Sequence, residues 1–181
     1  IRPIIALLAE RVDAHEPIVA SIEPDLDKIR LIQEQIRTGL NTVNTSSLGR
    51  LFDAAAALLR LGRKNRFEAE LPMALEAIAA DGIQAAYPIE LREEGGVWTF
   101  GQVSIIEGML ADIKGHTDRA VVAARFQNSV CEGLLELAQK ARLATGLSTA
   151  ALSGGVFCNR YVANRLIGRL QEAGFRVLWK K

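Results

Sequence analysis

The sequence predicts an α/β fold, and three observations lead to this prediction. Segments with apolar residues at helical spacing cover most of the chain. Residues 86–100, "AYPIELREEGGVWTF", alternate around a Glu-Gly-Gly turn, which is typical of a β-hairpin. Residues 149–179 run from a short strand through a glycine loop and a helix to another strand. This order indicates a βαβ unit with parallel strands and with its loop at the carboxyl end of the first strand.

Composition narrows the class of protein. With 181 residues, 49% of them apolar, the chain is long enough for one domain or for one lobe of a larger domain. Its 22 Lys and Arg residues nearly balance its 21 Asp and Glu residues, and a net charge of +1 does not favour nucleic acid or an anionic membrane as partner. Cys131 and Cys158 lie far apart without a CxxC motif, which favours a reducing compartment. We expect a soluble, cytoplasmic protein with no membrane span.

Residues 1–40 read as a helical lead-in segment, in which a loop joins two helices. In the second helix Pro24 suits the first turn, and Gly39 supplies the end. The sequence begins with Ile1 rather than Met, and its last strand is still under way at Lys181. We therefore expect a fragment of a larger protein.

Residues 44–65, "NTSSLGRLFDAAAALLRLGRKN", predict a helix with its leucines and Phe52 on one face. Ser46 or Ser47 can cap its start, and Gly62 can close its end. Further helices are expected over residues 70–82, 101–115 and 119–146.

Gly49 and Asp53 are not required by the core of that helix. Glycine in the first turn costs about 1 kcal/mol relative to alanine, and Asp53 lies on a different face from the leucines. A helix start that attracts anions, followed by a carboxylate able to hold a ribose diol, suits a nucleotide. The alternative is a capped helix with a surface ion pair between Arg50 and Asp53, which contributes little to stability.

The loop "SGGVFCN", residues 153–159, lies where open α/β sheets bind ligands, at a helix N-terminus. Gly154 and Gly155 would let a base or a phosphate approach the backbone, and the amide of Asn159 can donate and accept toward a nucleobase edge. The alternative is a tight turn in which Asn159 caps the helix. The GxGxxG and GxxxxGK[ST] patterns are absent from the sequence.

No catalytic or metal-ligating set can be assembled from the sequence. His15 and His116 lie in loop-like stretches, and no partner at triad or metal spacing accompanies either one. Cys158 has no nearby base to activate its thiol. Catalytic residues therefore stay unassigned, and we expect no metal ligands in this chain.

Several segments in order resemble the carboxy-terminal part of the HypF family, the carbamoyltransferases that mature NiFe-hydrogenases. The resemblance covers about residues 38–181. The matching segments are "TSSLGRLFDAAAALL", "FEAELPMALEAIA", "AYPIEL", "AARFQNSV", "ALSGGVFCNR" and "AGFRVL".

The resemblance implies most of the second lobe of an actin/Hsp70-like ATPase fold (ASKHA, ribonuclease H-like), with helices packed on a mixed sheet. Residues 41–181 would then be the nucleotide-binding lobe of a HypF-like carbamoyltransferase domain. The resemblance also implies a set of nucleotide contacts. These residues are Gly154, Gly155 and Asn159 on the adenosine side, and Gly49 and Asp53, with Ser46 and Ser47, on the ribose and phosphate side.

The resemblance implies an ATP-dependent reaction of the whole protein. Carbamoyl phosphate and ATP would give carbamoyl-adenylate, and the carbamoyl group would pass to the C-terminal cysteine of HypE, while the fragment alone would be inactive. A divalent metal would belong to the complete domain, with its ligands outside this segment. Two alternatives are a small-molecule O-carbamoyltransferase of the same fold and a non-catalytic nucleotide-binding module.

Three positions, Phe67, Ala69 and Gln127, depart from the family pattern. The family commonly has tyrosine-glutamate-glycine where this chain has Phe67, Glu68 and Ala69, and a histidine where it has Gln127. Because the glycine of this stretch is replaced by Ala69, we do not assign nucleotide contacts to that loop.

Overall fold

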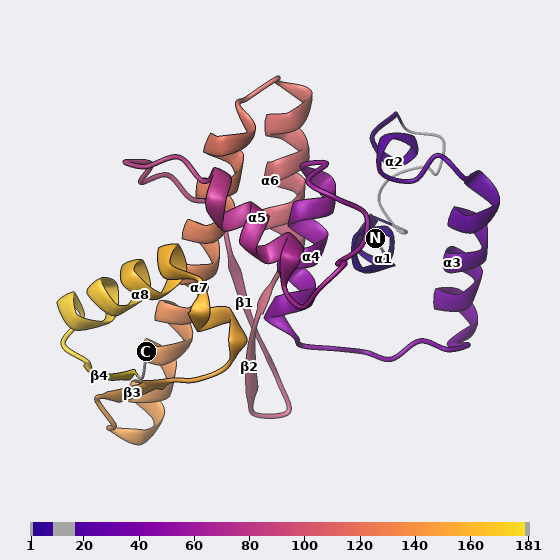
Figure 1. Cartoon of the computed structure of the whole chain (residues 1–181). Coiled ribbons are helices and arrows are strands. Elements are labelled where there is room, and N and C mark those ends of the chain that lie inside the picture. Colours follow the sequence, from indigo (N-terminus) through magenta and orange to yellow (C-terminus); the bar gives the residue numbers. More distant parts are fainter. Residues whose placement is uncertain (1, 9–16, 180–181) are drawn as a thin grey trace. The chain divides into compact units, whose positions relative to one another are not determined.

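The computed structural model describes residues 2–8 and 17–179 (Figure 1). The chain packs as two compact units, Ile1–Ala77 and Ile78–Lys181. The sequence predicts a different division, into a helical lead-in segment over residues 1–40 and a nucleotide-binding lobe over residues 41–181. Because that division is defined by nucleotide binding, it stays a prediction. His15 and part of the first expected helix lie outside the described residues.

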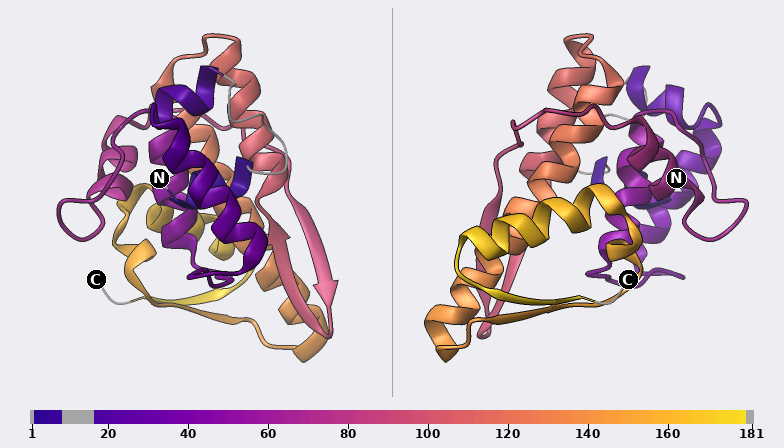
Figure 2. Two further views of the ribbon diagram at one scale, coloured as in Figure 1. Left: turned by 90° about the vertical axis from the view of Figure 1, so that its right-hand side faces the viewer. Right: turned by 60° about the vertical axis from the view of Figure 1, so that its left-hand side comes forward.

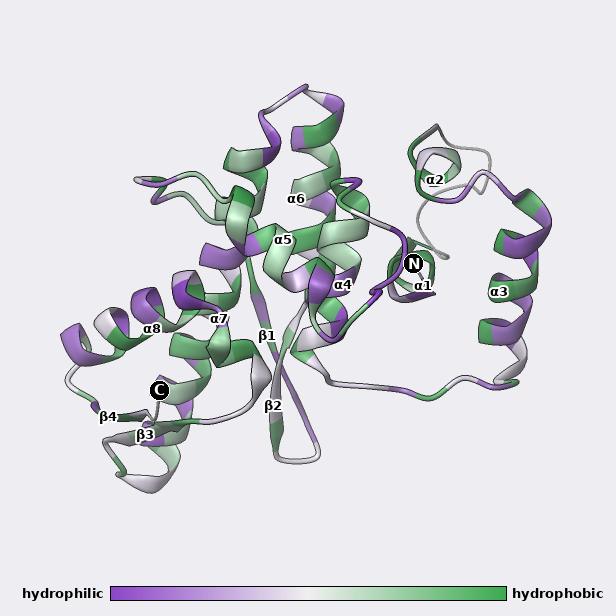
Figure 3. Cartoon of the chain, in the orientation of Figure 1, coloured by the Kyte–Doolittle hydropathy of each residue, from purple (hydrophilic) through white to green (hydrophobic). Residues whose placement is uncertain are grey.

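The first unit consists of helices around a buried central one. Its elements are α1 (Arg2–Leu8), α2 (Pro17–Ile22), α3 (Leu26–Thr38), α4 (Leu48–Leu58) and α5 (Glu70–Ile78). Residues 51–59 of α4 and its C-cap are buried throughout, and both α1 and α2 pack against α4. In α3 apolar and polar segments alternate along the helix (Figure 3), and Ile29 and Ile32 are its buried residues. Burial of the α4 surface on all sides makes it the core of this unit.

Two expected helix ends differ from the structure. The second helix starts at Leu26, two residues after Pro24, because the Asp25 side chain accepts from the N–H groups of Asp27 and Lys28 and caps it. Helix α4 ends at Leu58 rather than near Gly62. A Cβ on Gly62 would lie 2.6 Å from Cδ2 of Leu71, so this glycine permits close packing of the first turn of α5. The predicted end at Gly39 is confirmed.

The second unit combines three helices with two short sheets. Strands β1 (Glu90–Glu94) and β2 (Val97–Gly101) form the predicted antiparallel hairpin, and the left-handed backbone of Gly95 and Gly96 suits its tight turn. Helices α6 (Val103–Lys114) and α7 (Arg119–Thr145) follow and pack together. The described strands form two separate two-stranded sheets, this hairpin and a parallel pair near the end of the chain. The resemblance implied a single mixed sheet instead.

The predicted βαβ unit closes the chain. Strand β3 (Thr149–Leu152) pairs in parallel with β4 (Arg176–Trp179), with Ala150 opposite Val177. Helix α8 (Arg160–Glu172) lies along one side of this pair and also packs on α7 (Figure 2). A short 3₁₀ helix, η1 (Gly155–Cys158), occupies the loop between β3 and α8. The α/β class and the parallel arrangement are therefore confirmed.

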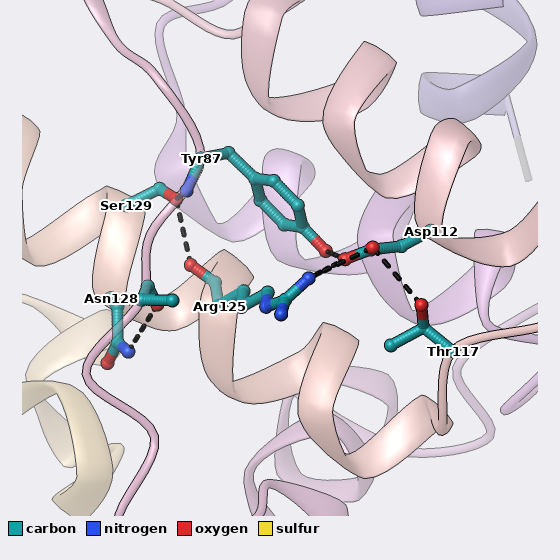
Figure 4. A network of polar contacts seen from close by, with 7 residues as sticks. Tyr87, Asp112, Thr117, Arg125, Asn128 and Ser129 are labelled. Atoms are coloured by element: carbon teal, nitrogen blue, oxygen red, sulfur yellow. Dashed lines mark hydrogen bonds and ion pairs between the residues drawn. The ribbon is translucent and has the colours of Figure 1, made fainter. Parts of the chain in front are cut away.

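A polar network holds the segment before the hairpin onto α6 and α7 (Figure 4). The Tyr87 hydroxyl donates to Oδ2 of Asp112 at 2.6 Å, and Nη1 of Arg125 donates to both carboxylate oxygens of Asp112 at 2.8 and 2.9 Å. The Thr117 hydroxyl completes the set at 3.2 Å. One carboxylate thus joins α6, α7 and the chain that leads into β1.

This network shifts the pKa of two of its members. Burial, followed by the hydrogen bond to Asp112, raises the pKa of Tyr87 above its usual range. Burial opposes ionisation of Asp112, but the hydrogen bonds from Tyr87 and Arg125 outweigh it and lower the pKa of that carboxyl. The charged form of Asp112 is therefore favoured by folding.

Replacing Asp112→Asn should lower the free energy of unfolding by about 2 kcal/mol at neutral pH, because charge-assisted hydrogen bonds are lost. The folded-state pKa of Asp112 lies below the unfolded value of about 3.9. The contribution of the Asp112 carboxylate to the free energy of unfolding is therefore present above that pH and disappears as the pH falls through the folded-state pKa. Urea unfolding of parent and variant should show a difference that shrinks below about pH 4. Asp27→Asn, at a side chain 93% exposed, is the control, and a pH-independent difference would contradict this assignment.

Ala69, one of the departures from the family pattern, lies where the backbone is left-handed. Its φ of 60° is in the left-handed region, which glycine adopts at low cost and alanine does not. The glycine that the family commonly has at this place therefore suits the backbone geometry just before α5.

Ala69→Gly should raise the free energy of unfolding by a few tenths to about 1 kcal/mol, since relief of the left-handed strain exceeds the extra entropy lost by glycine. Thermal and urea unfolding measure the change. Ala74→Gly, inside α5, is the control and should destabilise by about 1 kcal/mol. A loss of stability in Ala69→Gly would show that the alanine methyl group packs usefully.

Candidate functional site

The residues expected to contact a ligand form two groups, one in each compact unit. Ser46, Ser47, Gly49 and Asp53 surround the start of α4, and Gly154, Gly155 and Asn159 lie between β3 and α8.

Asp53 is a largely buried carboxylate on α4, with its side chain 11% exposed. Its Oδ2 accepts from Nη1 of Arg50 at 3.0 Å, and its Oδ1 accepts from Nδ2 of Asn65 at 2.9 Å. The ion pair with Arg50 that was considered as the alternative is thus present. Because each carboxylate oxygen has two lone pairs, this arrangement leaves acceptor capacity on both oxygens.

Asn65 is a neighbour of Asp53 that the sequence did not predict. Besides donating to Asp53, its Oδ1 accepts from the backbone N–H of Leu71 at 2.8 Å, near the start of α5. Twelve residues separate Asn65 from Asp53, and no helical or strand periodicity connects them. A loop asparagine suggests a turn, so no pattern in the sequence identified this contact.

The N-cap residue of α4 does not cap the helix with its own side chain. Ser47 is the N-cap residue, but its side chain makes no capping hydrogen bond, and Ser46 is exposed. A Cβ on Gly49 would come no nearer than 3.6 Å to Oγ of Ser47, so its surroundings do not require a glycine there. A helix start with no side-chain cap is suited to an acceptor group from elsewhere.

The two glycines of the 153–159 loop differ in their structural role. Gly154 has φ 106° and ψ 163°, a conformation that L side chains rarely adopt, so the turn itself requires this glycine. A Cβ on the exposed Gly155 would meet no atom of the described residues within 4 Å, and the φ of Gly155 is not positive. The tight-turn alternative therefore explains Gly154 but leaves Gly155 unexplained.

Asn159 caps α8 and is 7% exposed. Its Oδ1 accepts from the N–H of Val162 at 2.9 Å, and its Nδ2 donates to Oε1 of Gln127 at 2.7 Å. Asn159 therefore has the capping role that was the alternative to a ligand contact. The second hydrogen bond fixes which way the amide points, and Gln127 was not identified as its partner from the sequence.

The cysteines and histidines provide no catalytic centre within the described residues. Burial raises the pKa of the Cys131 thiol to about 12, while Cys158 is exposed and both cysteines are free. His116 lies in the turn between α6 and α7. No group of three or more His, Cys, Asp or Glu residues that could hold a metal ion occurs in the described part of the chain.

The described helices include none that is both long enough and apolar enough to cross a membrane.

Comparison with solved structures shows a close likeness. The structure superposes on full-length HypF in its phosphate- and nucleotide-bound form with a TM-score of 0.91 over 98% of this chain, at 29% identity. That alignment covers 28% of the longer chain. HypF of T. kodakarensis, at 22% identity, has the same fold with a TM-score of 0.73.

Sequence comparison also finds proteins named HypF. The carbamoyltransferase HypF of Synechocystis sp. is 32% identical over 138 residues, which cover 76% of this chain and 17% of the relative. The HypF homolog of Cupriavidus necator is 31% identical over 157 residues, which cover 82% of this chain and 39% of the relative. The chain thus spans less than half the length of either protein.

A family model described as carbamoyltransferase, Kae1-like domain, second subdomain, matches residues 1–181. The resemblance to HypF is thereby confirmed. Because this match spans the whole sequence, the chain belongs to the HypF carbamoyltransferase family as the second subdomain of its Kae1-like domain.

Proposed function

We propose that this chain is the nucleotide-binding lobe of an ATP-dependent carbamoyltransferase. The observation that carries the proposal is its structural likeness to nucleotide-bound HypF over 98% of its length. The chain itself adds an exposed Gly155, whose surroundings leave room for a ligand, and the spare acceptor capacity of the Asp53 carboxylate.

In this proposal Gly154, Gly155 and Asn159 receive the adenosine, while Asp53 and Gly49, with Ser46 and Ser47, face the ribose and phosphates. Asn159 retains one N–H and one lone pair beyond its bonds to Gln127 and Val162, which suits a nucleobase edge. The missing side chain at Gly155 allows the base to approach the backbone.

In the proposed reaction one water cleaves carbamoyl phosphate into carbamate and phosphate. An oxygen of the carbamate then attacks the α-phosphorus of ATP, which gives carbamoyl-adenylate as pyrophosphate leaves. The C-terminal cysteine thiolate of HypE then attacks the carbonyl carbon, its sulfur–carbon bond forms, and AMP leaves with the electron pair. The lobe contributes by positioning the adenylate, because the described residues include no assigned acid, base or nucleophile.

The resemblance also implies a divalent metal. No group of three or more suitable side chains occurs among the described residues. Following the resemblance, the proposal assigns the metal ligands to a part of the enzyme outside this segment. We further propose a cytoplasmic location, which the two free thiols support.

Asp53→Asn in the full-length protein should weaken ATP binding about tenfold while the melting temperature changes little. Asparagine keeps the shape but removes the charge that strengthens a hydrogen bond from a ribose hydroxyl. The lost Arg50 pair costs little because that side chain is 62% exposed. Calorimetric titration and melting of the same samples test this expectation, and unchanged ATP affinity would refute the ribose contact.

Gly155→Val should also weaken ATP binding without unfolding the protein, because its side chain enters space that no described atom occupies. Gly154→Ala is the matched control, since strain at φ 106° should lower its melting temperature. If Gly155→Val lost affinity only together with its fold, the loop would be a structural turn.

The macromolecular partner should be HypE rather than nucleic acid. The full-length protein, given ATP and carbamoyl phosphate, should transfer labelled carbamoyl to HypE and fail with HypE whose C-terminal cysteine is replaced by serine. Tight, salt-sensitive binding of tRNA would instead indicate a tRNA-modifying function. Transfer to a small hydroxylated acceptor would indicate an O-carbamoyltransferase, and ATP binding without transfer a non-catalytic module.

A further inference from the structure

The loop between α4 and α5, residues 59–69, is attached to the buried carboxylate of Asp53 through one side chain. Asn65 uses both ends of its amide, donating from Nδ2 to Asp53 at 2.9 Å and accepting at Oδ1 from the N–H of Leu71 at 2.8 Å. Its neighbour Arg66 is bound to Glu70 in addition, with Nε 2.7 Å from Oε1. The loop is thus fastened to the start of α5 at Asn65 and at Arg66.

The two donors to Asp53 differ in how firmly they hold it. Arg50 reaches the carboxylate with a long side chain that is 62% exposed, so its position is weakly restrained. Asn65 is exposed as well, but its side chain is short and its acceptor end is itself bound to backbone. The bond from Asn65 therefore restrains the rotation of the Asp53 carboxylate about its terminal torsion more firmly than the bond from Arg50 does, and this torsion has a broad energy minimum by itself.

We propose that Asn65 is a positioning residue that orients the Asp53 carboxylate toward the hydroxyls of a ribose, and so makes the site selective for ribonucleotides. This inference rests on the proposed nucleotide-binding function. A ribose offers two O–H donors to the remaining lone pairs of the carboxylate, whereas a deoxyribose leaves one acceptor unpaired in a largely buried place. A carboxylate that rotates freely cannot make this distinction well.

The test uses ATP, 2′-deoxy-ATP and 3′-deoxy-ATP as ligands of the full-length protein, with affinities from calorimetry. The parent should bind ATP at least about tenfold more tightly than one of the deoxy compounds, as expected for hydrogen bonds to a charged group. In Asn65→Ala this ratio should fall to within about threefold, chiefly because ATP binding weakens. Asn164→Ala, at an exposed asparagine on α8, is the control and should keep the parent ratio.

A second variant keeps the test decisive if Asn65→Ala unfolds. Asn65→Asp places two carboxylates at hydrogen-bond distance, where they cannot both stay ionised easily. The preference of the Asn65→Asp variant for ATP over the deoxy compounds should be lost at about pH 8. It should return partly at about pH 5, where a proton shared by the two carboxyl groups recreates the donor. The parent should show no such recovery on acidification.

The outcomes separate this inference from the proposed function. If Asp53→Asn leaves ATP binding unchanged, the proposed site is wrong and the role of Asn65 is wrong with it. If Asp53→Asn weakens binding while Asn65→Ala weakens ATP and both deoxy compounds equally, Asn65 supports the loop only and the inference is overturned. Loss of the ribose preference in Asn65→Ala, with its pH-dependent recovery in Asn65→Asp, supports it.

Discussion

The first unit depends on how it accommodates the buried carboxylate of Asp53, which lies on an otherwise apolar stretch of α4. Helix α4 is buried along residues 51–58, and Asp53 lies within that stretch. A buried charge is costly unless hydrogen bonds compensate for the lost water, so donors must reach it from elsewhere in the fold. Arg50 supplies one from the same helix, and Asn65 supplies the other from the following loop. The path of that loop, and the place where α5 begins, follow from this requirement.

Helix α7 imposes a comparable requirement on the second unit. Gln127, Asn128 and Ser129 are consecutive and fully buried, so segments packed against them must offer matching polar groups. Asn128 donates to the carbonyls of Ile83 and Ala85 at 2.9 and 2.8 Å, which ties the chain before the hairpin to α7. Gln127 meets the cap of α8 through Asn159. Satisfying buried polar groups thus determines where the other elements attach.

The sequence allowed the regular elements to be predicted, because helices and strands repeat on a local period. The hairpin turn at Gly95 and Gly96 and the parallel βαβ unit were predicted for this reason, and both are confirmed. The partners of the candidate site residues could not be predicted in the same way. Asn65 and Gln127 approach their partners across 12 and 32 residues, and such contacts follow from packing rather than from any repeat. The left-handed backbone at Ala69 also gave no local signal.

The two thiols of the second unit differ in a way that makes them natural reporters. Cys158 is exposed in the loop before α8, whereas Cys131 is enclosed between α7 and α8, with Sγ 3.6 Å from the carbonyl oxygen of Val162. A thiol reagent therefore labels Cys158 in the native protein and reaches Cys131 only when these helices separate. The rate of the second labelling event measures how often α8 leaves α7, without any introduced probe.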